Sequence, residues 1–204
     1  MKKLLLLFTF CLFPIFLNAQ TANNILDKVT SSFKKIKCLK SRYSLKLTEN
    51  GKSSSHIGCI IIQGNKYVNY INGTTIWFNG KTMWTLVEEN EEVTITEPSS
   101  SEINNSNPYH FINSYKTEFN SQLINSSGNA YIIQLTPKQS NNEFKKMVVN
   151  VSKGTYQPVK LALYTNKSTI SIDIQTYESI RPYNSKTFSF NKRKYPNVEI
   201  NDLR

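Results

Sequence analysis

The stretch TTIWFNGKTMWTL, residues 74–86, consists of two short runs of β-branched and aromatic residues joined by Asn79-Gly80. An Asn-Gly pair between such runs is typical of a two-residue β-hairpin, because a type I′ turn requires a positive φ at both central residues. This turn predicts four pairs across the hairpin: Phe78 with Lys81, Trp77 with Thr82, Ile76 with Met83, and Thr75 with Trp84.

The predicted hairpin has two apolar faces, because side chains alternate across a strand. One face carries Trp77, Trp84 and Leu86, and the other carries Ile76, Phe78 and Met83. An exposed antiparallel sheet normally has one polar face. We therefore expect this hairpin either to be covered on both sides or to line a cavity on one side.

Most of the remaining chain alternates between apolar and polar residues, which predicts further short strands separated by polar turns. These strands are expected at 39–47, 57–63, 66–71, 93–96, 131–136, 144–151, 159–164, 169–177, 187–190 and 198–200. An apolar stripe predicts a helix from residue 21 to about 36. Asn107-Pro108 predicts the start of a second, short apolar helix, after a Ser- and Asn-rich break at 98–107.

A long antiparallel meander tends to curl or close. The sequence therefore predicts a mainly β (α+β) fold, a half-open barrel of about eleven antiparallel strands covered by an N-terminal helix and a short lid helix. A double-layer sandwich is the competing architecture, since strands that are apolar on both faces fit both.

The first nineteen residues have the pattern of a secretory signal peptide, with Lys2-Lys3, an apolar run and a cleavage site after Ala19. We expect residues 20–204 to form a single exported domain. Its charge is basic, because removing Lys2 and Lys3 leaves 23 Lys and Arg against 14 Asp and Glu. Such a surface suits an anionic membrane surface or an acidic partner, or has no specific role, and nucleic acid is the least favoured partner for an exported chain.

Two cysteines remain in the exported chain, Cys38 and Cys59. A hairpin centred on Asn50-Gly51 would pair Arg42 with Cys59 and leave Cys38 about four residues further along its strand. That separation exceeds the Cα distance of about 7 Å that a disulfide can bridge. We therefore expect free thiols.

The sequence contains no recognisable catalytic or metal-binding motif. His56 and His110 are the only histidines, and no HExxH, GxSxG, glycine-rich phosphate loop or clustered Cys/His spacing occurs. We expect no enzyme activity, no cofactor and no metal; a small hydrolase is a distant alternative. A cavity lined by aromatic and aliphatic residues instead suits an acyl chain or another apolar ligand.

Several motifs resemble the periplasmic outer-membrane lipoprotein carrier family, the LolA-type proteins. Residues 79–84, NGKTMW, resemble the family's D-G-K-T-L-W turn. Further matches follow in the same order along the chain: the Pro-led helix at 107–112, LTPK at 135–138, F-x-F at 188–190, and VEIND at 198–202, which is similar to the family's V-x-x-D-D tail. The resemblance implies an eleven-stranded half barrel that carries acylated lipoproteins through the periplasm, as a monomer, from an inner-membrane release complex to an outer-membrane acceptor.

The resemblance also implies where the ligand binds. The acyl chains are expected among Ile60, Ile62, Ile76, Phe78 and Met83, beneath a lid at 109–115 that contains Tyr109, Phe111, Ile112 and Tyr115. Trp77 and Trp84 are an alternative lining pair, since the sequence does not settle which face of the hairpin points inward.

One position departs from the family. Its members usually carry F-R-W on the third strand, with an arginine that hydrogen-bonds the lid, whereas this chain has Tyr67-Val68-Asn69. Either other groups hold the lid, or the cargo and its transfer differ. A carrier of another lipid, or a sensor of mislocalised lipoprotein, on the same scaffold are therefore the alternative functions.

Overall fold

A computed structural model describes residues 13–126, 128–139 and 144–204. Its helices are α1 (Phe13–Lys34), α2 (Ser100–Ser106) and α3 (Phe111–Glu118), and short 3₁₀ helices span Glu88–Asn90, Ser185–Phe188 and Lys192–Lys194. The strands are β1 (Leu39–Glu49), β2 (Lys52–Gln63), β3 (Lys66–Ile71), β4 (Thr74–Phe78), β5 (Met83–Val87), β6 (Glu92–Thr96), β7 (Phe119–Asn125), β8 (Ala130–Pro137), β9 (Phe144–Ser152), β10 (Pro158–Thr165), β11 (Ser168–Ile174), β12 (Glu178–Ser179) and β13 (Glu199–Asp202).

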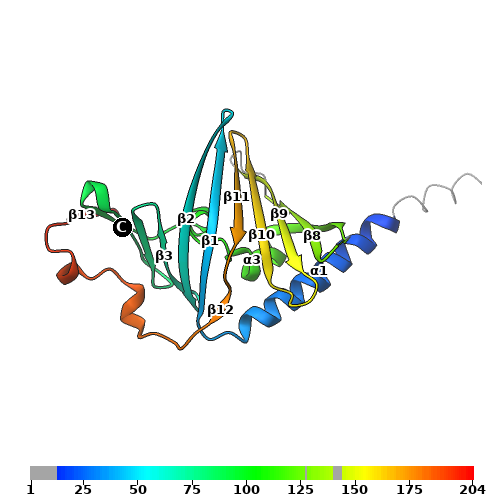
Figure 1. Cartoon of the computed structure of the whole chain (residues 1–204), viewed down its shortest axis with the longest axis horizontal. Coiled ribbons are helices and arrows are strands. Elements are labelled where there is room, and N and C mark those ends of the chain that lie inside the picture. Colours follow the sequence, from blue (N-terminus) through cyan, green and yellow to red (C-terminus); the bar gives the residue numbers. More distant parts are fainter. Residues whose placement is uncertain (1–12, 127, 140–143) are drawn as a thin grey trace, which may run out of the picture.

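All of these strands belong to one sheet that does not close. Its order is β13-β6-β5-β4-β3-β2-β1-β11-β10-β9-β8-β7, with β12 beside β1. Neighbouring strands are antiparallel except β13, which pairs with β6 in parallel. Figure 1 shows the strands fanning out from β13 to β8, with α1 crossing near the β8–β10 end. The predicted half-open antiparallel fold is thus confirmed, and the sandwich alternative is wrong.

Helix α1 presents its predicted apolar stripe to the sheet, where Ile25, Leu26 and Val29 are buried. Its C-terminal end agrees with the prediction to two residues, but the helix begins at Phe13, inside the predicted signal peptide. Residues 1–12 of that segment lie outside the described residues, and cleavage after Ala19 stays a prediction. In the part of the chain that the structure describes, no helix has the length and apolar character needed to cross a membrane.

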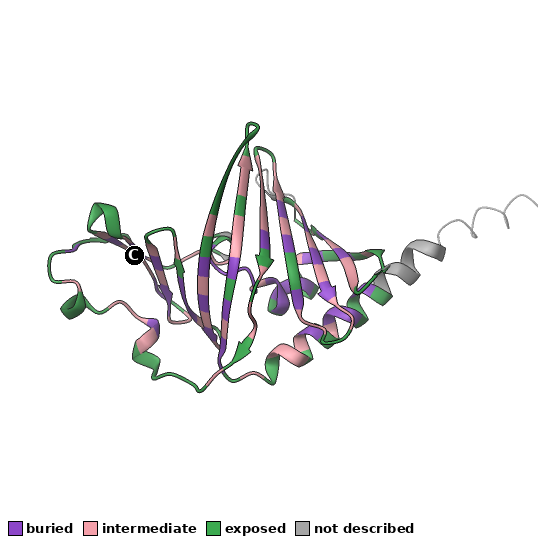
Figure 2. Cartoon of the chain, viewed as in Figure 1, coloured by how far each residue is buried: buried purple, intermediate pink, exposed green. Residues whose placement is uncertain are grey.

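Two apolar clusters form on opposite faces of the sheet. Figure 2 shows buried residues along β1–β3, β9, β10 and α1. The inner core lies between the sheet and the three helices and holds most of the buried side chains. The outer core lies between β3–β6 and the C-terminal segment and comprises Val68, Trp77, Leu86, Val93, Phe188 and Val198. Both faces of the Trp hairpin are therefore packed in a core, and Ile76 on the inner face also lines a cavity, so the structure combines the two arrangements that the sequence allows.

The predicted pairing across the Trp hairpin is wrong by two residues. Phe78 pairs with Met83 and Trp77 with Trp84, so the turn has four residues instead of two. The Asn79 side-chain oxygen accepts the backbone N–H groups of Lys81 and Thr82, both at 2.9 Å, and only Gly80 of the Asn79-Gly80 pair has a positive φ. A shift of two residues leaves every side chain on its predicted face.

The Ser- and Asn-rich break contains α2, which the sequence analysis missed. Ser99 and Glu102 form a capping box, in which the Ser99 hydroxyl accepts the Glu102 N–H and the Glu102 carboxylate accepts the Ser99 N–H at 2.8 Å. The next helix, α3, begins at Phe111 rather than at Pro108, because Asn107 accepts the Tyr109 N–H and forms a separate turn first.

Three further differences concern strands. β7 and the two-residue β12 were not predicted, and the strand expected at 187–190 is replaced by the 3₁₀ helix at Ser185–Phe188.

The hairpin at Asn50-Gly51 agrees with the prediction, since both residues have a positive φ and Arg42 pairs with Cys59. Cys38 and Cys59 are free thiols, as expected.

Candidate functional site

A cavity of about 160 Å³ lies between the inner face of the sheet and the segment that contains α2 and α3. Its apolar wall consists of Leu45, Ile71, Ile76, Pro108, Phe111, Met147, Leu163, Ile170 and Ile172. Its polar wall consists of Tyr43, Asn69, Asn104, Asn105, Ser106 and Asn107. Every described residue that lines the cavity is uncharged, so the cavity suits an apolar ligand.

The structure brings part of the predicted site together. Ile76 and Phe111 line the cavity, and Ile60, Ile62, Phe78 and Met83 are buried in the inner core on the same face of the sheet. The remaining lid residues, Tyr109, Ile112 and Tyr115, are also buried in the inner core. Whether these residues bind a ligand stays a prediction.

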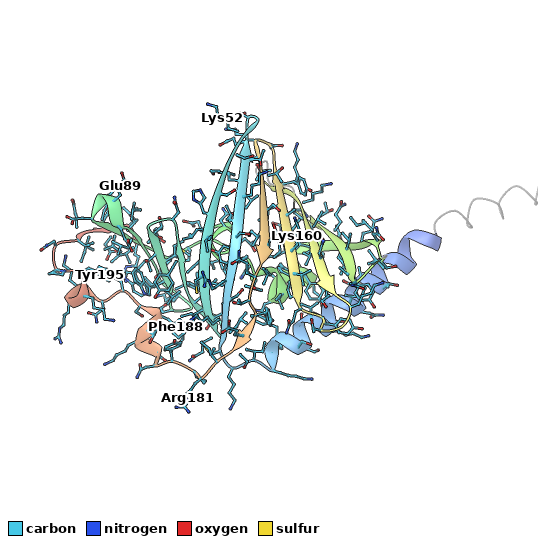
Figure 3. All side chains as sticks on the ribbon, viewed as in Figure 1. Lys52, Glu89, Lys160, Arg181, Phe188 and Tyr195 are labelled. Atoms are coloured by element: carbon cyan, nitrogen blue, oxygen red, sulfur yellow. The ribbon has the colours of Figure 1, made fainter. Side chains whose placement is uncertain are left out.

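Trp77 and Trp84 lie on the opposite face of the sheet. The Trp77 ring packs edge-on against Phe190 and Tyr195, with ring centroids 5.7 and 6.0 Å apart. Figure 3 shows Phe188 and Tyr195 on the C-terminal segment that runs along this side of the sheet. The face that points toward α2 and α3 is therefore the one with Ile76, Phe78 and Met83.

Most of the cavity wall was not identified from the sequence. Leu163 on β10 and Ile170 and Ile172 on β11 point to the same face as Leu45, because β1, β11 and β10 pair in register. The sequence shows that apolar and polar residues alternate in these strands. It does not show that β11 lies beside β1 in the sheet.

A chain of hydrogen bonds crosses the sheet beneath α2. The Tyr43 hydroxyl donates to the Asn69 side-chain oxygen at 2.8 Å, and the Asn69 amide donates to the Ser106 carbonyl at 2.9 Å. The Ser106 hydroxyl donates to the Glu102 carbonyl, so in its 2.5 Å contact with Tyr67 the tyrosine is the donor. Two tyrosines and one asparagine of the sheet thus hold the C-terminal end of α2.

Gly58 makes this chain of hydrogen bonds possible. Gly58 lies on β2, between Tyr43 on β1 and Ile71 on β3. A Cβ atom at Gly58 would lie 2.3 Å from the Tyr43 ring carbon Cζ. The missing side chain therefore lets the Tyr43 ring cross β2 and reach Asn69 on β3.

Val68, which we expect from the sequence to stand at the position of the family's arginine, takes no part in these contacts. Its side chain is fully buried in the outer core, on the face opposite α2. Its neighbours Tyr67 and Asn69 point to the inner face and bond Ser106. Of the two alternatives that the sequence left open, the structure thus supports lid contacts made by other groups.

The segment 100–118, which we call the lid segment, is also attached at Tyr109 and at α3. The Tyr109 hydroxyl donates to Ser41 on β1 at 2.6 Å, because the Ser41 hydroxyl itself donates to the Thr176 carbonyl. On α3, the Ile112 carbonyl accepts from Thr30 of α1 at 2.9 Å.

A second link between α3 and α1 is charged. Tyr115 donates to the Asp27 carboxylate, and Lys116 forms an ion pair with it at 2.6 Å. The hydrogen bonds from Lys116 and Tyr115 hold the pKa of Asp27 below its ordinary value. Both ion-pair partners are about half exposed, so solvent weakens this contact.

Burial raises the pKa of Tyr43 and of Tyr67 to about 12 and also raises that of Tyr109. All three hydroxyls therefore stay protonated at physiological pH and remain donors.

Among the residues that the structure describes, no three His, Cys, Asp or Glu side chains are grouped so that they could hold a metal ion.

Comparison with known proteins gives a family match and fold matches. The family model described as outer membrane lipoprotein carrier protein LolA matches residues 13–167. No curated protein sequence matches the chain.

Three solved structures share the fold. An uncharacterised conserved protein from Thermus thermophilus is 9% identical, with a TM-score of 0.60 over 89% of this chain and 99% of that one. A DUF1329 family protein from Desulfovibrio piger is 15% identical, with a TM-score of 0.51 over 82% and 97%. A candidate outer membrane lipoprotein-sorting protein domain from Vibrio parahaemolyticus is 11% identical, with a TM-score of 0.50 over 87% and 99%.

Proposed function

We propose that this chain, which belongs to the outer membrane lipoprotein carrier family LolA, binds the acyl chains of lipoproteins in its cavity and carries them to the outer membrane. The observation that carries the proposal is the uncharged cavity between the sheet and the lid segment. Family membership adds the class of cargo, because its members are carriers of outer membrane lipoproteins.

The size of the cavity requires the lid segment to move. A cavity of about 160 Å³ is close to the ~150 Å³ of a protein cavity that binds benzene, and a long acyl chain is several times larger than benzene. Loading with a long acyl chain would therefore displace the lid segment from the sheet.

The energies involved allow reversible loading. Opening the lid segment breaks its contacts with Asn69, Tyr67 and Ser41, and each hydrogen bond contributes about 1 kcal/mol net. Burial of an acyl chain contributes about 0.8 kcal/mol per CH₂, so roughly four CH₂ groups offset the loss of these three hydrogen bonds. Further CH₂ groups of a longer chain would replace the apolar contacts that Phe111, Ile112 and Tyr115 of the lid segment lose on opening.

Family membership also supports an exported location, since the cargo is destined for the outer membrane. We place the protein in the periplasm, as a monomer that receives lipoproteins from an inner-membrane release complex and delivers them to an outer-membrane acceptor. Transient contact with a membrane surface would accompany these transfers. No catalytic step is needed, since the cargo is only bound and released.

Binding of a synthetic triacylated lipopeptide tests the proposal. Ile170→Trp would fill the cavity, while Ser171→Trp places the same bulk on the opposite face of β11. We expect the first variant to lose at least tenfold in affinity and the second to bind as the wild type does. Equal binding by both folded variants would show that the cavity is not the site.

A second candidate function is the carriage of another lipid on the same scaffold. It is favoured by Val68 in place of the family's arginine, because a different lid contact is compatible with a different cargo. Extraction of the purified protein distinguishes the two, since this candidate predicts free lipid and no acylated polypeptide.

A further inference from the structure

Positive charge gathers along one edge of the molecule. Residues 34–42 include four Lys and one Arg but no acid, and residues 178–195 include three Lys and two Arg against one acid, Glu178. The two segments meet where β12 pairs with β1 and the Ile180 N–H donates to the Cys38 carbonyl at 2.9 Å. Figure 1 shows the chain after β12 running along the lower edge of the molecule toward β13. Both segments therefore contribute to one basic edge.

Most cations of this edge are exposed and have no acidic partner. None of them takes part in an ion pair of the described chain. Lys192 donates to the Val198 carbonyl, and Lys40 lies opposite Glu178 across β1 and β12, so we leave both out. The exposed cations that remain outside the sheet form what we call the basic rim: Lys34, Lys35, Lys37, Arg181, Lys186, Arg193 and Lys194.

Acidic side chains gather at a different edge. Residues 88–97 include five Glu, and β13, which pairs with β6, adds Glu199 and Asp202. Figure 3 shows Glu89 and Arg181 at separate edges of the molecule. An anionic surface attracts the rim and repels the acidic edge, so it would orient the molecule with the basic rim toward itself.

The residue types of the rim favour a lipid surface over an acidic protein. Five of its seven cations are Lys, which is depleted at protein–protein interfaces, whereas Arg is enriched there. A Lys ammonium is a hydrated point charge on a flexible stem, and it can pair with a mobile headgroup wherever that headgroup lies.

An exposed tyrosine lies among these cations. The Tyr183 side chain is 44% exposed, although its backbone is held in place. Its N–H donates to the Gln63 side chain at 2.9 Å, and its carbonyl accepts from the same side chain at 3.2 Å. Tyrosine is enriched at the headgroup level of membranes, because its ring is apolar and its hydroxyl is polar. Tyr183 thus adds a second feature that suits a membrane surface.

We propose that the basic rim docks the protein on the anionic phospholipid headgroups of a membrane. The rim begins directly after Phe33, whose ring stacks on Tyr109 of the lid segment with centroids 6.2 Å apart. Docking would therefore bring this attachment of the lid segment close to the membrane. This role rests on the proposed function, because a carrier must reach a membrane to exchange lipoproteins.

Co-sedimentation of the exported protein with sucrose-loaded vesicles measures the docking. We expect binding to vesicles of phosphatidylcholine and phosphatidylglycerol in a ratio of about three to one, and at least tenfold weaker binding to vesicles of phosphatidylcholine alone. Raising the NaCl concentration from about 0.1 M to about 0.5 M should weaken the binding to anionic vesicles at least tenfold, because salt screens exposed charges.

A triple variant assigns the binding to the rim. Each Lys or Arg near an anionic membrane surface strengthens binding roughly fivefold. The combination of Lys35→Gln, Lys37→Gln and Lys186→Gln should therefore bind anionic vesicles roughly 100-fold more weakly than the wild type. Its affinity for a triacylated lipopeptide should not change, since none of the three residues lines the cavity.

The matched control removes the same charge elsewhere. Lys46→Gln, Lys52→Gln and Lys167→Gln lie on or close to the β1–β2 and β10–β11 turns, which share one end of the sheet because β1 and β11 pair. Figure 3 shows Lys52 at the end opposite Arg181. This triple variant should bind anionic vesicles within about threefold of the wild type.

The outcomes separate docking from cargo binding. Equal binding to neutral and anionic vesicles, or equal losses in the two triple variants, would overturn the proposed docking. Protein that binds no vesicles but still binds the lipopeptide would also overturn it, and would leave the rim to an acidic protein. Vesicle binding without lipopeptide binding would instead contradict the proposed function and leave the docking surface in place.

Discussion

The contact between Asn69 and Ser106 should set how readily the cavity opens. In Asn69→Leu, the shape of the side chain is nearly kept, but its amide no longer donates to the Ser106 carbonyl and its oxygen no longer accepts from Tyr43. The bond to Ser106 exists only while the lid segment is closed. Its loss therefore shifts the lid segment toward the open state.

The size of this shift follows from the burial of the groups. Asn69 and Ser106 are 3% and 7% exposed, so the Ser106 carbonyl in the closed variant is left without this donor in a dry environment. An orphaned buried group costs about 1–3 kcal/mol. A shift of about 2 kcal/mol corresponds to a roughly 30-fold larger ratio of open to closed molecules.

Stopped-flow uptake of a fluorescent acyl probe measures the effect. If entry requires the open state, the uptake rate rises in proportion to the open fraction, as long as that fraction stays small. We expect Asn69→Leu to take up the probe roughly 10–30-fold faster than the wild type.

Val68→Ala is the matched control, because Val68 lies one residue away in the outer core. It should lower the free energy of unfolding without changing the uptake rate. An unchanged rate in folded Asn69→Leu, or an equal acceleration in Val68→Ala, would refute the reasoning.

Three further predictions concern the supports of the site. Gly58→Ala should lower the free energy of unfolding by about 1–3 kcal/mol in denaturant titrations, because the added Cβ would lie 2.3 Å from Tyr43. Gly154→Ala is the control: no atom lies closer than 4.0 Å to the added Cβ, so the loss should be less than half as large. Phe188→Ala should cost about 3–5 kcal/mol by the same measurement, because this ring is fully buried in the outer core, yet the affinity of the folded protein for acyl probes should not change. The pKa of Asp27 is lowered in the folded protein, so its contact with α3 persists at pH values above the ordinary pKa of 3.8 and is lost as the pH falls below it. The rate of probe uptake should therefore stay constant from pH 8 to 5 and rise only below about pH 4. Asp27→Asn should abolish that rise.

The sheet was predictable because its signals are local. Alternation and turn residues located most strands, and the Asn-Gly rule held at Asn50-Gly51, where both residues adopt a positive φ. The same rule failed at Asn79-Gly80, because the Asn79 side chain caps two backbone N–H groups and enlarges the turn. The rule describes backbone preference and does not include this competing side-chain bond.

Two elements were missed for different reasons. The capping box of Ser99 and Glu102 was visible in the sequence, but the polar residues that follow it lack the apolar stripe by which a helix is usually identified. β7, read FNSQLIN, is too polar to stand out as a strand, and its pairing with β8 stabilises it in the sheet.

The cavity was harder to predict than the fold. Its walls combine strands far apart in the sequence, such as β4 and β11, and no local pattern reports that they share one cavity. The hydrogen bonds that hold α2 depend on a glycine, Gly58, that lets Tyr43 cross a neighbouring strand. Such a contact follows from the sheet order, which the sequence did not settle.

Native mass spectrometry with lipid extraction, on protein purified gently from the cells that export it, tests the central claim most directly. We predict that the protein carries an acylated polypeptide, released when the lid segment opens. Protein that is empty and also fails to take up an acyl probe in solution would contradict it.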